Sequence, residues 1–107
     1  MPSRREKLEA LLADEPGDTF LRYALAMEWQ KEGDVDKALG SFQDLIRQQP
    51  PHVPAYFMAA KMLVAEQRVS DARSFLREGI EQARAQGETH AAAEMSEYLE
   101  ALGHYGQ

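Results

Sequence analysis

The chain has 107 residues, 18 of them acidic and 12 basic, which gives a formal net charge of −6. This length predicts a single domain with its own core, and the negative charge argues against nucleic-acid binding, which depends on clustered Lys and Arg. Because the chain has no cysteine, disulfides, thiolate chemistry and zinc-thiolate sites are excluded, and packing must hold the fold together.

Helix-start and helix-stop residues divide the chain into six segments. Ser3 and Glu6 form the pattern of a capping box, and Gly33 followed by Asp34 supplies a left-handed turn residue and then a helix cap. The expected helices run from about residue 4 to a stop at Pro16, and over about 20–31, 35–48, 53–66, 69–84 and 88–102. No convincing strand pattern is visible, so the chain is predicted to be all-α.

The apolar segments do not have the form of export or membrane segments. The leucines near the N-terminus are interrupted by charged residues, so we see no export signal and expect a cytoplasmic protein. The longest apolar stretch, residues 54–64, contains Lys61 and is too short to span a bilayer. We therefore expect no membrane insertion.

The sequence repeats with a period of 34 residues. Such a period is typical of a two-helix hairpin that cannot bury its apolar face alone and must stack on copies of itself. The first helix of each unit, 20–31 and 53–66, is apolar nearly all round, whereas the second is amphipathic. The residues that recur 34 positions later are Ala26, Glu32, Val35, Ala38, Ile46 and Gln48.

Small and aromatic residues fit this hairpin geometry. Ala26 with Ala38, and Ala60 with Ala72, stand where the two helices of each hairpin should cross closely. Trp29, the single tryptophan, is expected in the core.

These residues resemble the tetratricopeptide repeat, whose pattern is W-x2-L-G-x2-Y, then A-x3-F, then P. Arg22 departs from the Trp slot of the first repeat, and Arg84 departs from the Pro slot of the second. The slots of the first repeat are filled by Leu25, Ala26, Trp29, Ala38, Phe42 and Pro50.

The resemblance implies an all-α, helix-turn-helix repeat solenoid, with about six antiparallel helices in a right-handed stack. Residues 1–107 would then form one tetratricopeptide-like domain. We expect it to contain a half repeat at about 3–16, full repeats at 19–52 and 53–86, and a capping helix at 88–102.

The resemblance also implies a non-catalytic adaptor or scaffold that binds an apolar peptide or helix of a protein partner. The partner would lie in a concave groove formed by the first helix of each hairpin. Lys31 and Lys61 are the only groove cations and the chain has no Asn, so a clamp for the carboxylates of chaperone tails is not expected. The groove residues carried onto this sequence are Phe20, Tyr23, Met27, Lys31, Phe57, Met58 and Lys61.

Two alternatives remain for these groove residues. They can simply pack against neighbouring helices as part of the core, or a second copy of the chain can occupy the groove and form a homo-oligomer.

The sequence contains no pattern that predicts catalysis. It has no G-x-S-x-G, no G-x-G-x-x-G and no phosphate-binding loop, and its three histidines lack metal-ligand spacing. We therefore expect no enzyme activity, no cofactor and no metal. The last helix should present a negative face from its glutamates, and an apolar stripe that includes Met95 and Tyr98 should pack on the fifth helix.

Overall fold

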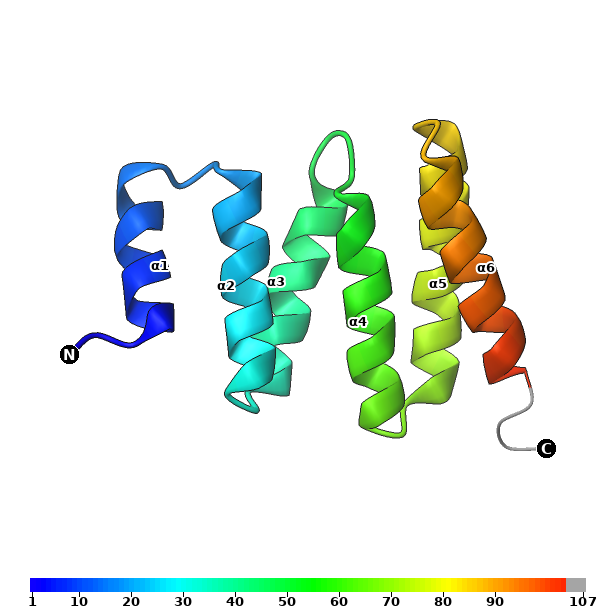
Figure 1. The fold of residues 1–107 in the computed structure, drawn as a ribbon, viewed down its shortest axis with the longest axis horizontal. Helices are drawn as coiled ribbons and strands as arrows, with labels where there is room; N and C mark the ends of the chain where they lie inside the picture. Colours follow the sequence, from blue (N-terminus) through cyan, green and yellow to red (C-terminus); the bar gives the residue numbers. More distant parts are fainter. Residues whose placement is uncertain (104–107) are drawn as a thin grey trace. The chain divides into compact units, whose positions relative to one another are not determined.

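The computed structural model describes residues 1–103, which form six α-helices and no strand (Figure 1). This confirms the predicted all-α helical repeat fold, with helix ends within one or two residues of their expected places. None of the helices in this range is long and apolar enough to cross a membrane. The predicted domain also includes residues 104–107, which lie outside the described part of the chain. The helices are α1 (Arg4–Asp14), α2 (Thr19–Lys31), α3 (Val35–Arg47), α4 (Val53–Ala65), α5 (Val69–Ala85) and α6 (Thr89–Leu102).

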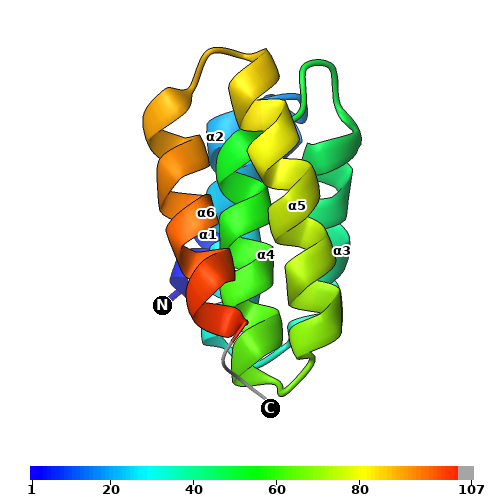
Figure 2. The ribbon, with the colours of Figure 1, turned by 90° about the vertical axis from the view of Figure 1, so that its right-hand side faces the viewer.

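Contacts within the chain define two compact units, Met1–Ala55 and the residues from Tyr56 onwards. In the first unit, α2 lies beside both α1 and α3 (Figure 1). In the second unit, α5 and α6 pack side by side, and α4 contacts both of them (Figure 2).

The 34-residue period is visible in the backbone of the two hairpin turns. Gly33 has a φ of 85°, and Gln67, which stands 34 positions later, has a φ of 63°. Both residues therefore adopt the left-handed conformation that glycine accepts at no steric cost. The next residues differ, because Asp34 caps α3 by accepting a 3.1 Å hydrogen bond from the Lys37 amide, whereas Arg68 makes no side-chain cap. The second turn keeps the conformation of the first with less suitable residues.

Two helix ends have hydrogen-bonded or charged groups that stabilise them, one predicted from the sequence and one not. The capping box of α1 is complete, because Ser3 and Glu6 exchange both of its hydrogen bonds. At the other end of the chain, α6 has no basic residue in its last turn. Arg73 of α5 supplies the missing cation, donating from Nη2 to the carbonyl oxygen of Leu102 at 2.7 Å.

Each unit buries the pair of alanines that the sequence places at a helix crossing. Ala26 and Ala38 are fully buried in the first unit, and Ala60 and Ala72 are fully buried in the second, as expected where small residues let helices approach. The second unit has a further close contact at Gly79 of α5, where an added Cβ would lie 2.7 Å from Tyr56 Cβ. The largest fully buried side chains are Phe42, Leu45, Leu63, Leu76 and Met95.

Trp29 differs from the sequence expectation, since it is partly exposed and flanked by cations rather than enclosed in the core. The Arg5 guanidinium of α1 lies 4.7 Å from the centre of its ring, and the Lys37 ammonium of α3 lies 4.5 Å from it. Arg5 also donates from Nε to both carboxylate oxygens of Glu32 at 3.0 Å. Trp29 of α2 therefore joins α1 and α3 to its own helix through its contacts with Arg5 and Lys37.

Candidate functional site

The groove residues predicted on α2 share one face of that helix. Phe20, Tyr23, Met27 and Lys31 are spaced by three or four residues, which places them in one row along the helix surface. Phe20 is 76% exposed, Lys31 is exposed, and Tyr23 and Met27 are partly buried. The row therefore presents two aromatic rings, a thioether and an ammonium to solvent in part or in full.

Tyr23 is held in place by other rings of the first unit. Its ring centre lies 4.9 Å from that of His52, in an edge-to-face arrangement, and 6.1 Å from that of Phe42. Burial raises the pKa of the Tyr23 phenol. The side chain thus has a packing role as well as partial exposure, and replacing it would disturb the fold.

Lys31 is part of a charge cluster at the end of α2. Its Nζ lies 3.9 Å from Oε1 of Glu28, and the same oxygen accepts an ion pair from Nε of Arg4 at 2.8 Å. Glu28 is the buried charged residue of this cluster, with 9% of its surface exposed. The Glu28 carboxylate therefore forms ion pairs with two cations, and Lys31 is the more exposed and more distant of the two.

Two of the groove residues predicted on α4, Phe57 and Lys61, take part in ring contacts. The ring centre of Phe57 lies 5.3 Å from that of Tyr98 on α6, with the rings nearly perpendicular. Lys61, one turn after Phe57, places its Nζ 3.9 Å from the centre of the Phe57 ring. Phe57 and Met58 are partly buried and Lys61 is exposed. Tyr98 was not among the predicted groove residues, although its ring contacts that of Phe57.

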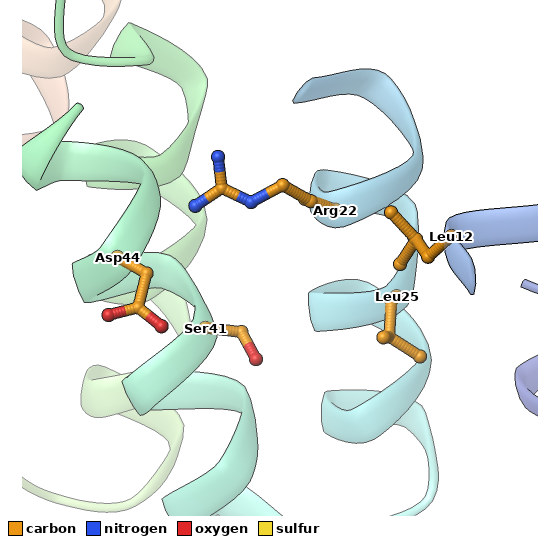
Figure 3. Close-up of a pocket in the computed structure, with 5 residues that line it drawn as sticks. All are labelled: Leu12, Arg22, Leu25, Ser41 and Asp44. Carbon is orange, nitrogen blue, oxygen red and sulfur yellow. The ribbon is translucent and has the colours of Figure 1, made fainter. Parts of the chain in front are cut away.

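The first unit also contains a pocket that was not predicted from the sequence (Figure 3). Its volume is about 180 Å³, and it is lined by Leu12 of α1, Arg22 and Leu25 of α2, and Ser41 and Asp44 of α3. In Figure 3, Arg22 extends from α2 towards α3, from which Ser41 and Asp44 project, and the two leucines lie together on the opposite side. The signal that could have found it is Arg22, a charged residue in the slot where the family pattern has Trp.

The charges in this pocket are not paired with each other. Arg22 donates from Nη1 to Oε1 of Gln48 at 3.0 Å, and no ion pair joins it to a carboxylate in residues 1–103. Asp44 has a 3.9 Å ion pair with Arg47, in which both side chains are mostly exposed. A cation and a carboxylate therefore face the same small volume from opposite helices.

Possible metal ligands are not grouped in the described residues. His90 lies 3.3 Å from Glu94, between Nε2 and Oε1, on the exposed surface of α6. Across residues 1–103, no three His, Asp or Glu side chains are placed to hold a metal ion.

Comparison with known proteins gives a consistent result. The family model described as tetratricopeptide repeat matches residues 30–96. A TPR repeat-containing protein of Pseudomonas aeruginosa is 27% identical over 97 residues, covering 91% of this chain and 92% of that protein.

Solved structures show the same similarity. The solution structure of a tetratricopeptide repeat domain protein from Salinibacter ruber has a TM-score of 0.78 and 31% identity, covering 86% of this chain and 94% of that one. A protein from Bordetella parapertussis, 23% identical, matches over the whole of both chains with a TM-score of 0.81 and so shares the fold.

Proposed function

Because the chain belongs to the tetratricopeptide repeat family, we propose that it is a non-catalytic adaptor that binds an apolar peptide or helix of another protein. Domains of this family generally mediate protein–protein interaction. The proposed binding residues are Phe20, Tyr23, Met27 and Lys31 on α2 and Phe57, Met58 and Lys61 on α4.

The observation that carries the proposal is the apolar row on α2 that begins at the exposed Phe20. A single exposed phenylalanine is ordinary on a protein surface, but Phe20, 76% exposed, starts a contiguous apolar row, and such a row is typical of an interaction site. Tyr23 and Met27 continue the same row on α2 with partly exposed side chains. A partner helix with apolar residues at three- and four-residue spacing would match this row.

Methionine and lysine suit a partner of variable shape. The unbranched side chains of Met27 and Met58 can change rotamer to fit different apolar surfaces. Lys61 lies over the Phe57 ring, and its flexible stem allows it to move aside or to pair with an acidic residue of the partner.

The test separates an external partner from a second copy of the chain. Phe20→Ala removes the exposed ring and should change the free energy of unfolding by less than about 0.5 kcal/mol, as for most surface substitutions. Leu11→Ala, at a residue 52% exposed on α1, is the matched control because it removes exposed apolar surface outside the proposed site. Peptides selected from a displayed library of amphipathic helices are measured against both variants by fluorescence anisotropy.

We expect Phe20→Ala to weaken peptide binding by about tenfold or more, as for an aromatic interface residue worth about 1.4 kcal/mol or more, and Leu11→Ala to leave it within about twofold. Equal binding by both variants and the parent protein would overturn the proposed site. Sedimentation across a wide concentration range adds the second arm. A stable dimer that Phe20→Ala dissociates would replace the external partner with a second copy.

A further inference from the structure

The pocket between α1, α2 and α3 shares no residue with the proposed peptide site, so it can be considered separately. It is lined by Leu12, Arg22, Leu25, Ser41 and Asp44 (Figure 3). Its chemistry combines an apolar side from two leucines with a cation, a hydroxyl and a carboxylate.

Singly charged groups do not match the pocket. A carboxylate would be attracted to Arg22 but repelled by Asp44, and an ammonium would have the opposite difficulty. A purely apolar group would cover the leucines but would remove water from Arg22 and Asp44 without replacing their hydrogen bonds. The pocket is thus complementary to a neutral group that has an acceptor at one end and donors at the other.

We propose that this pocket binds a primary carboxamide on a short apolar stem, the end of a glutamine side chain in a protein partner. The carbonyl oxygen of the ligand accepts a hydrogen bond from the guanidinium of Arg22, whose Nη1 already donates to Gln48. The amide NH2 of the ligand donates hydrogen bonds to Asp44 or Ser41. The methylene groups of the stem lie against Leu12 and Leu25. Asp44 is suited to this role because its ion pair with Arg47 is long, at 3.9 Å, and exposed.

The size of the pocket agrees with a single side chain. Its volume of about 180 Å³ is close to the roughly 150 Å³ of an engineered cavity that holds benzene. Sites for whole drug-sized ligands are larger, at about 300–1,000 Å³. The pocket therefore suits one anchoring side chain of a partner rather than a free metabolite of that size.

The test uses small probes, so that it does not depend on the proposed peptide site. Isotope-labelled full-length protein is titrated with N-acetyl-glutamine methylamide and, separately, with the glutamate and lysine analogues, and backbone amide shifts are recorded by NMR. We expect the glutamine probe to shift the amides of Leu12, Leu25, Ser41 and Asp44, with a dissociation constant of about 10 mM, and the other two probes to bind at least about fivefold more weakly.

A substitution at Asp44 gives a readout that a purely structural role would not produce. Asp44→Ala removes the repulsion of carboxylates and should invert the preference, so that the glutamate probe binds more tightly than the glutamine probe. Asp36→Ala, on the same helix but outside the pocket lining, removes an equal charge and should keep the original preference. Equal shifts from all three probes, no shifts at the pocket amides, or an unchanged preference in Asp44→Ala would each overturn the proposal.

Discussion

The substitution Gly79→Ala tests the packing of the second unit, because it replaces one hydrogen atom of Gly79 by a methyl group. A methyl group at this position would lie 2.7 Å from Tyr56 Cβ, 2.8 Å from Met95 Sδ and 3.0 Å from Tyr56 Cγ. Favourable contacts between carbon atoms occur at about 3.5–4.0 Å. Met95 can move its thioether, but Tyr56 Cβ is fixed to the backbone of α4, so the two helices must separate.

The size of the effect follows from two opposing contributions. Overpacking a well-filled core costs about 1–3 kcal/mol, and the upper part of this range applies because Tyr56 and Met95 are 3% and 1% exposed. Alanine in place of glycine within a helix stabilises by about 0.5–1 kcal/mol. Gly79→Ala should therefore lower the free energy of unfolding by about 1–2 kcal/mol, which is about 4–8 °C in Tm.

Gly40→Ala is the matched control for this substitution. Gly40 also lies inside a helix, α3, but an added Cβ there meets no atom within 4 Å. At Gly40 the higher helix propensity of alanine is therefore not opposed by a steric clash, and Tm should rise by about 2–4 °C. Thermal unfolding followed by circular dichroism compares the two variants with the parent protein. An equal rise in Tm for both variants would refute the close contact at Gly79.

Three further predictions concern a turn, a helix cap and a cation over a ring. Gln67→Gly should raise the free energy of unfolding by about 0.5–1 kcal/mol, because it removes a side chain from a residue in the left-handed conformation. Gln67→Ala should give no such increase, and an equal denaturation midpoint for the two variants would contradict this reason. The Ser3 backbone amide, then its hydroxyl, lowers the pKa of Glu6, so this cap contributes stability above the ordinary glutamate pKa and loses it as pH falls through the lowered value. Ser3→Ala should move the Glu6 pKa part of the way upwards in an NMR titration, and no movement would argue against the cap. Arg5→Ala should make Trp29 more accessible to acrylamide quenching because a guanidinium leaves one face of its ring, and quenching equal to that of the parent would contradict the stacking.

The fold followed closely from local signals in the sequence. Ser3 with Glu6, Asp34 after Gly33, and the apolar periodicity each act within a few residues, so the helix positions could be predicted from the sequence. The alanine pairs were predicted as close crossings from the repeat alone, and Ala26 and Ala38 are fully buried.

The site was harder to predict because it depends on contacts between residues far apart in the chain. The Phe57–Tyr98 ring contact joins α4 to α6, whereas the apolar stripe of α6 could be assigned from sequence only to its neighbour α5. The cations over Trp29 come from α1 and α3, and periodicity gives no indication of which charged residues meet a given ring. The pocket at Arg22 likewise needs three helices to form.

The central claim, that exposed residues of α2 and α4 bind a partner segment, is tested most directly by mapping a bound peptide. Amide shifts of the labelled protein are compared with and without a helix selected for binding. We expect the largest changes at two sets of residues, Phe20, Tyr23 and Met27 on α2 and Phe57 and Met58 on α4. Changes confined to α1, α3 and α5, with α2 and α4 unaffected, would contradict it.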